Sequence, residues 1–219
     1  MTTSLNPSLL APERKGERTR AALVAAAVGR FAVDGFLRTS VADVARDIGV
    51  GPTAVYRYFP DKESLFVAAV DADAEALIDL ARQAVATNYL GPMATMISRV
   101  TASITVALRD HPLAARVLAG AEPMTPERIL ALPALTDFRQ QLTTLIHAGQ
   151  AAGLVRPDVD AESLALGCET VVLYQLAHLA SLLRVDREAN LSDERWTGVA
   201  TILDAALRPC SPPPQGRHR

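Results

Sequence analysis

The 219-residue sequence lacks the features that mark several specialised protein classes. It has two cysteines, Cys168 and Cys210, too few for a disulfide framework, and neither has a partner at metal-ligand spacing. The longest apolar stretch, residues 170–183, is too short to span a bilayer and contains Gln175 and His178. The N-terminus does not follow the charged-then-apolar order of a signal peptide. These absences predict a cytoplasmic protein with no metal, no cofactor and no membrane partner.

Strand signals are nearly absent as well. The sequence shows no sustained alternation of apolar and polar residues, whereas helical periodicity with abundant Ala and Leu runs through most of it. The sequence therefore predicts an all-α fold of about nine to ten helices. We expect them at about 12–33, 41–48, 52–59, 61–87, 93–110, 112–120, 126–151 (divided at Pro133), 161–184 and 192–208. Residues 1–12 and 209–219, rich in Pro and polar residues, are predicted to be a disordered arm and tail.

The charge is unevenly distributed along the chain. The formal net charge is −2, but residues 1–62 carry nine Lys or Arg against six Asp or Glu, which leaves the remainder acidic. A basic N-terminal part joined to an acidic remainder indicates two functions, the first compatible with a polyanionic partner.

Small and apolar residues in the segment 41–55 follow the steric pattern of a helix-turn-helix. When Val41 is position one, Ala45 falls at position five, Gly49 at nine and Val55 at fifteen. Two steeply crossing helices need a small side chain at their contact, a residue that tolerates positive φ at the turn, and an aliphatic anchor from the second helix. The alternative is a helical hairpin without a DNA-binding role.

In a helix-turn-helix, the N-terminal residues of the second helix meet base edges in the major groove. Here these residues include Pro52 and Thr53, and Arg57 follows one turn later with a guanidinium that can make a bidentate contact to guanine. Tyr56 and Tyr58 carry hydroxyls suited to phosphate oxygens, although either tyrosine could instead pack against the core. We therefore predict base contacts from Pro52, Thr53 and Arg57, and phosphate contacts from the two tyrosines.

Further phosphate contacts are predicted on either side of this segment. Lys62 lies at the start of the next helix, where its charge adds to the N-terminal amides. Thr39 and Ser40 stand at the start of the preceding helix, where Ser40 could also serve only as a cap for Asp43. A basic arm could be formed by Arg14, Lys15, Arg18 and Arg20, unless these charges are simply solvated.

The stretch "TSVADVARDIGVGPTAVYRYFPDKESLF", preceded by a long first helix, resembles the TetR family of bacterial transcriptional regulators. The resemblance is strong over roughly residues 16–66; beyond them only helix number and lengths agree. Carried over by position, it gives phosphate contacts to Tyr56, Tyr58 and Lys62, and base contacts to Pro52 and Thr53. Gly51 departs from the family's usual Ser cap, and Thr53 stands where the family often has glycine.

The resemblance implies a DNA-binding domain at 13–62 and a ligand-binding and dimerisation domain at 63–208. It also implies a homodimer built on the last two helices, a palindromic double-stranded DNA operator, and a repressor released by a small, mostly lipophilic effector. Apolar stripes and a few polar groups are candidate effector contacts, although such stripes are more often simple core. They are Met96, Val100, Met124, Phe138, Leu142, Tyr174 and His178.

Two other functions stay open on the sequence alone. One is a small all-α enzyme, although no catalytic motif or paired-carboxylate arrangement appears. The other is a helical protein-interaction module that no longer binds DNA, which the set of Tyr56, Tyr58 and Lys62 disfavours.

Overall fold

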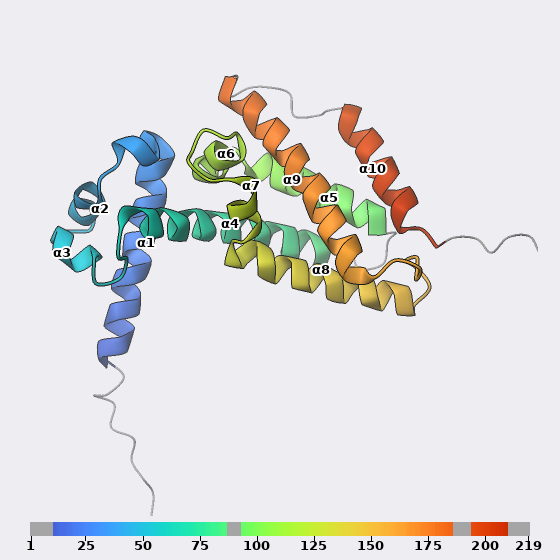
Figure 1. Ribbon diagram of the computed structural model, residues 1–219, viewed down its shortest axis with the longest axis horizontal. Helices are drawn as coiled ribbons and strands as arrows, with labels where there is room; N and C mark the ends of the chain where they lie inside the picture. The colour runs from blue at the N-terminus through green and yellow to red at the C-terminus, as the bar shows by residue number, and fades with distance from the viewer. Residues whose placement is uncertain (1–10, 87–92, 186–193, 210–219) are drawn as a thin grey trace, which may run out of the picture. The chain divides into compact units, whose positions relative to one another are not determined.

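The computed structural model describes residues 11–86, 93–185 and 194–209, and every regular element within these ranges is an α-helix (Figure 1). The all-α prediction is confirmed for this part of the chain, and Pro133 divides the 126–151 segment as predicted. The predicted arm and tail fall largely outside the described residues. The helices are α1 (Ala11–Arg38), α2 (Val41–Asp47), α3 (Pro52–Val55), α4 (Lys62–Ala86), α5 (Met93–Ala107), α6 (Pro112–Leu118), α7 (Pro126–Leu130), α8 (Pro133–Ala151), α9 (Ala161–Val185) and α10 (Glu194–Leu207).

Two predicted helix ends are wrong. Helix α1 continues to Arg38 instead of ending at Val33, with a kink where Gly35 adopts φ 76° and ψ 169°. A glycine can leave the helical conformation at little cost, and one more turn follows it. Helix α3 ends at Val55 and not near Phe59, because the amides of Tyr58 and Phe59 both bond to the Val55 carbonyl in a tightened turn.

By its internal contacts the chain forms two compact units. The first comprises residues 1–73 and 112–114, and the second comprises residues 74–111 and 115–219. The division falls inside α4, about halfway along the helix, whereas the sequence placed the domain boundary at the start of that helix.

The core of the first unit is built on three phenylalanine rings. The Phe66 ring stands edge-on to Phe31 and to Phe36, with centroids 5.0 Å apart in both pairs. Such aromatic pairs add about 0.5–1.5 kcal/mol beyond the area that they bury. The apolar side chains that complete this core are buried and come from α1 to α4 and from the turn after α3. They are Leu23, Ala27, Val44, Ala45, Val55, Phe59, Leu65 and Ala69.

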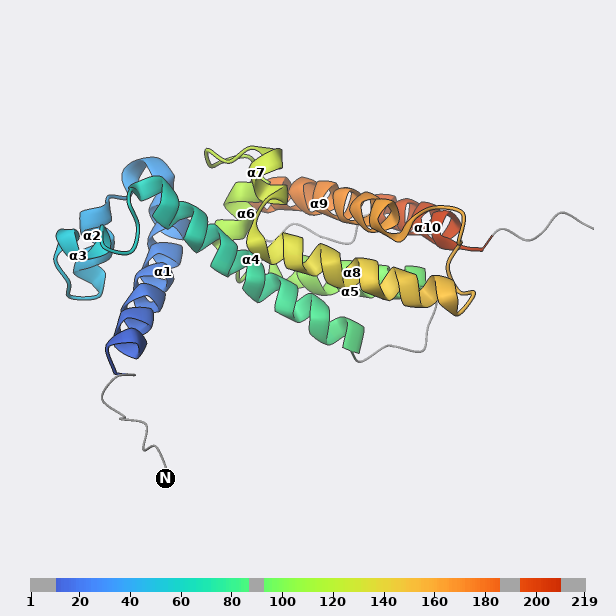
Figure 2. The same ribbon diagram turned by 60° about the horizontal axis from the view of Figure 1, so that its bottom comes forward.

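The second unit is a bundle in which α8 packs along α9, and α10 packs against α5 and α9 (Figure 2). The α8–α9 contact includes a buried ion pair, in which the Arg139 guanidinium bonds both oxygens of Glu169. Helix α9 is long and apolar enough to cross a membrane by length and composition, but core helices pass the same test. In the described part of the chain, α9 packs against α8, α5 and α10.

Candidate nucleic-acid interface

The turn between α2 and α3 is a Schellman motif centred on Gly49. Gly49 has φ 71°, its amide donates to the Arg46 carbonyl at 3.1 Å, and the Val50 amide donates to the Ala45 carbonyl at 3.0 Å. These bonds satisfy two carbonyls that the end of α2 would otherwise leave unpaired. The left-handed conformation predicted for Gly49 is confirmed, and it directs the chain from α2 into α3.

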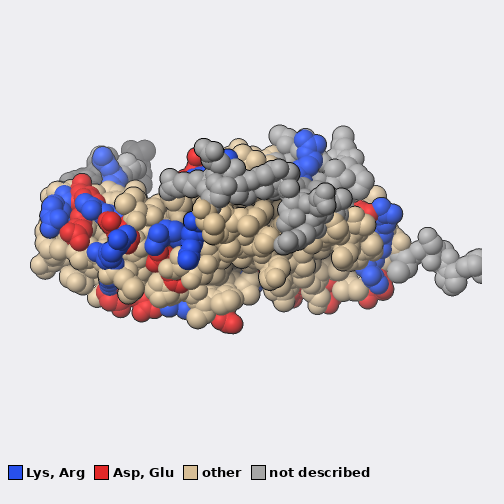
Figure 3. Space-filling model, turned by 90° about the horizontal axis from the view of Figure 1, so that it is seen from above, with Lys and Arg blue, Asp and Glu red and all other residues tan. Residues whose placement is uncertain are grey.

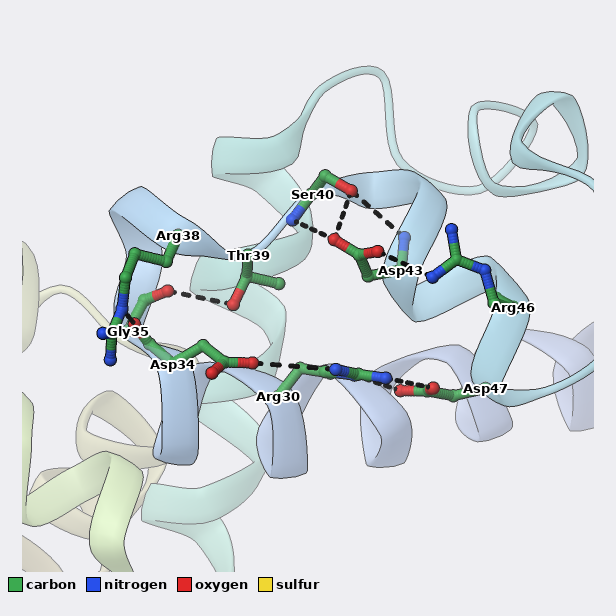
Figure 4. Close-up of polar contacts among 9 residues, drawn as sticks. All are labelled: Arg30, Asp34, Gly35, Arg38, Thr39, Ser40, Asp43, Arg46 and Asp47. Atoms are coloured by element: carbon green, nitrogen blue, oxygen red, sulfur yellow. Dashed lines mark hydrogen bonds and ion pairs between the residues drawn. The ribbon is translucent and has the colours of Figure 1, made fainter.

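A capping box opens α2 (Figure 4). The Asp43 amide donates to Ser40 Oγ at 3.1 Å, while the Ser40 amide and hydroxyl donate to Asp43 Oδ2 at 3.2 and 2.5 Å. The hydrogen bond from the Ser40 hydroxyl is the main reason that the pKa of Asp43 lies below its ordinary value, and Arg46 lowers it further. The predicted cap is therefore confirmed. A phosphate contact from the Ser40 hydroxyl stays a prediction, since its proton is directed to Asp43 here.

Thr39 lies inside the corner between α1 and α2. Its side chain is 3% exposed, and its hydroxyl donates to the Gly35 carbonyl at 2.9 Å (Figure 4). Thr39 thus anchors the kink in this structure, and its phosphate contact also stays a prediction.

The first turn of α3 presents an exposed surface above a buried anchor. Pro52 and Thr53 are exposed, whereas Val55 is fully buried between the helices. Gly51 precedes Pro52 in extended conformation and makes no side-chain cap, as its lack of a side chain requires. The predicted base-reading residues of this turn are therefore free to meet a groove.

Arg57 and Tyr56 extend the same exposed surface. Tyr56 is 53% exposed, and the Arg57 guanidinium carbon lies 6.0 Å from the centre of the Tyr58 ring. Tyr58 is half-buried, with its hydroxyl near Gly16 of α1. The side chain of Lys62, the first residue of α4, lies with its Nζ 4.3 Å from the centre of the Phe36 ring. With Thr39 and Ser40, the residues predicted to contact phosphate thus lie on three segments of the first unit: before α2, after α3 and at the start of α4.

An ion pair that the sequence did not reveal holds α1 to α2. Arg30 donates from Nε and Nη2 to the two carboxylate oxygens of Asp47, at 2.6 and 2.7 Å (Figure 4). The hydrogen bond from Arg30 is the main reason that the pKa of Asp47 lies below its ordinary value. The two residues are 17 positions apart, so no helical spacing pointed to the pair.

Arg30 and Arg46 are paired with aspartates, so part of the positive charge of the first unit is neutralised locally. Figure 3 shows basic and acidic side chains interspersed at the left-hand end, which holds this unit. Arg57, by contrast, is exposed and lies near the ring of Tyr58. Binding of a polyanion here would rest on a few placed cations and not on the net charge.

The predicted effector residues all belong to the second unit but differ in exposure. Val100 and Met124 are buried, Phe138, Leu142 and His178 are half-buried, and Tyr174 is 78% exposed. The side chain of Met96 lies outside the described part. Among the described residues, no group of three or more His, Cys, Asp or Glu is placed to hold a metal ion.

The family model for the N-terminal domain of bacterial regulatory proteins of the tetR family matches residues 23–69. An uncharacterized HTH-type transcriptional regulator of Haemophilus influenzae is 41% identical over 69 residues, which are 31% of this chain and 34% of that protein. The match thus spans about a third of the length of this curated relative.

Two solved structures are similar over most of the chain. The fatty acid degradation regulator FadR of Bacillus halodurans aligns with a TM-score of 0.63 and 19% identity, over 86% of this chain and 99% of that one. A tetR family transcription regulator described as putative, from Shewanella sp. PV-4, aligns with a TM-score of 0.59 and 19% identity, over 84% and 95%. These structures share the fold.

Proposed function

Because the chain belongs to the TetR family of bacterial regulatory proteins, we propose that it is a transcriptional regulator whose first unit binds double-stranded DNA. The observation that carries the proposal is the exposed first turn of α3, set by the Gly49 turn and anchored by buried Val55. This is the arrangement by which a second helix enters the major groove. The family match favours this regulator over a small all-α enzyme. The site of action is then the cytoplasm, where bacterial DNA lies.

The contacts divide into base reading and phosphate positioning. Thr53 and Pro52 meet base edges or a thymine methyl, and Arg57 makes a bidentate contact to guanine. Tyr56, Tyr58 and Lys62 bond phosphate oxygens and fix the register of the head on the duplex. Ser40 and Thr39, at the start of α2, also bond phosphate oxygens. Ser40 does so from its exposed position, and Thr39 does so after its hydroxyl turns away from the Gly35 carbonyl.

A homodimer would carry two reading heads. Helix α9 exposes Leu166, Tyr174 and Val185 on one broad face, and α10 exposes Ile202, which supports burial of these apolar side chains against a second copy. Heads placed about 34–36 Å apart would meet successive major grooves, so the operator would be palindromic.

The regulator acts as a repressor that a small, mostly lipophilic effector releases. The support is the apolar character of Val100, Met124, Phe138 and Leu142, which are buried or half-buried in the second unit. The effector must bind one head spacing better than another, with a coupling free energy of about 1–3 kcal/mol.

Fluorescence anisotropy with DNA from upstream of the protein's own gene, scanned over salt, tests the proposal. We expect log K to fall linearly with log salt, and Lys62→Ala to reduce the slope by about 0.9 per head. Arg57→Ala should weaken binding to the operator by about 1–3 kcal/mol while changing nonspecific binding little.

The matched control is Arg99→Ala, which removes an exposed arginine from the second unit. It should leave both the affinity and the slope unchanged. If no genomic fragment is retained in a selection with the wild-type chain, the DNA-binding proposal is wrong. If Arg57→Ala weakens all sequences equally, Arg57 contacts phosphate and not a base.

A further inference from the structure

Gln175, in the middle of α9, is a buried amide without a partner. The residue is 5% exposed, and its Nε2 is shielded from solvent with no hydrogen-bond partner among the described residues. In the part of the chain that the structure describes, it is the one buried side-chain nitrogen or oxygen in this state. Leaving such a donor unpaired costs free energy, so each case calls for an explanation.

The neighbours of Gln175 along α9 are mainly apolar. One turn before it on α9, Val171 and Val172 pack against the buried cluster around Cys168 and Leu203, and one turn after it Leu179 is buried. His178, half-buried, is the polar residue at the same spacing. Packing alone would favour Leu or Met at position 175, since an apolar side chain of that size leaves no donor unpaired.

Other buried polar groups of this unit do have partners. Glu169, 4% exposed and on the same helix, is bonded by Arg139, and Glu122 is bonded by Arg116. The unit therefore pairs its buried charges, and the unpaired amide of Gln175 is an exception to its own pattern. The missing partner is an acceptor, because Nε2 carries two N–H donors.

We propose that Gln175 is the polar anchor for the effector, which is a neutral, mostly apolar molecule with a carbonyl oxygen that accepts a hydrogen bond from Nε2. This rests on the proposed function, since it assigns the ligand class of that regulator. A neutral oxygen fits better than a carboxylate, because a buried charge needs a cation and Arg139 is already held by Glu169.

The test uses two matched probe pairs that differ by one carbonyl: 1-indanone with indane, and 2-nonanone with nonane. Binding is measured by thermal shift and by release of operator DNA. For the wild type we expect at least one ketone to bind and to release DNA, with an affinity about 5- to 10-fold higher than that of its hydrocarbon. In Gln175→Met, a variant of similar volume, this preference should disappear while the ligand-free protein becomes no less stable.

Gln140→Met is the control, because it makes the same exchange at an exposed position of α8. It should keep the ketone preference of the wild type. A second measurement, on the wild type alone, guards against misfolding of the variant: the side-chain amide signal of Gln175 in the NMR spectrum should shift with the ketone and not with the hydrocarbon.

The assignment is overturned if neither ketone binds, if Gln175→Met retains the ketone preference, or if the Gln175 amide signal does not respond. Operator binding in the absence of probe is recorded in every sample. Intact DNA binding with no ketone effect refutes only the effector class, whereas absence of DNA binding in the wild type refutes the proposed function itself.

Discussion

The carboxylate of Asp73, on α4, caps the first turn of α6 from a distance of 41 residues in the sequence. Its Oδ2 accepts a hydrogen bond from the Ala114 amide at 2.8 Å, and Asp73 is 7% exposed. The N-cap residue of α6, His111, makes no side-chain cap of its own. Asp73 therefore supplies the acceptor that a local Ser or Asp usually provides at a helix N-terminus. Both partners belong to the first unit.

Replacing Asp73 by alanine should lower the free energy of unfolding by about 2–3 kcal/mol. A hydrogen bond to a charged acceptor contributes about 1.5–3 kcal/mol, and the amide left behind in a buried position has no water to replace it. Asp73→Asn keeps an oxygen acceptor and loses only the charge, so it should cost about 1 kcal/mol. The ordering of the two variants is a sharper test than either magnitude.

Urea unfolding followed by circular dichroism measures the free energy, and hydrogen exchange of the Ala114 amide reports the bond itself. We expect faster exchange at Ala114 in Asp73→Ala than in Asp73→Asn, because only the asparagine can still accept from that amide. Equal loss of stability in both variants would refute the capping role. Unchanged exchange at Ala114 in the alanine variant would do the same.

Three further outcomes are expected. Arg139→Leu leaves Glu169 buried without its cation and should cost about 3 kcal/mol in unfolding free energy, most of which a second change, Glu169→Leu, should restore. Gly49→Ala places a side chain at φ 71° and should lower the free energy of unfolding by about 1–2 kcal/mol. Gly51→Ser lies at an extended residue with open space around it, and it should raise that free energy by a few tenths of a kcal/mol because serine caps α3. Urea unfolding measures both changes. The pKa of Asp47 is lowered in the folded protein, so its carboxylate stabilises the fold above the unfolded-state pKa. This stabilisation is lost as the pH falls through the folded-state pKa. In an acid titration from about pH 5 downward, Asp47→Asn should therefore lose less stability than the wild type.

Local chemistry made the helix-turn-helix predictable from the sequence. Gly49 is one of few residue types that accept positive φ, and Ser40 with Asp43 three residues later forms a capping box within one turn. Pro133 cannot continue a helix from the residues before it, so it opens a new one. Each of these predictions depends on neighbours within about four residues, and each is confirmed.

Features that depend on distant residues were missed. The Arg30–Asp47 pair joins two helices across 17 residues, and the Asp73 cap joins two across 41. The hydroxyl of Thr39 also has a partner that the sequence did not indicate, the Gly35 carbonyl four residues before it, while its phosphate contact stays a prediction. The kink at Gly35 creates that acceptor, and the sequence indicated a helix end there instead of a kink.

Tyr174 and Gln175 show why the second unit was harder to predict than the first. The two residues are adjacent on α9, so about 100° of helix rotation separates their side chains. On a helix that is apolar on most sides, hydrophobic periodicity gives little contrast to decide which one faces the core. In the structure Tyr174 is 78% exposed, whereas Gln175 is only 5% exposed. Tyr174, predicted as an effector contact, therefore fits better on the face proposed to meet a second copy. The amide next to it has the burial that an effector anchor requires.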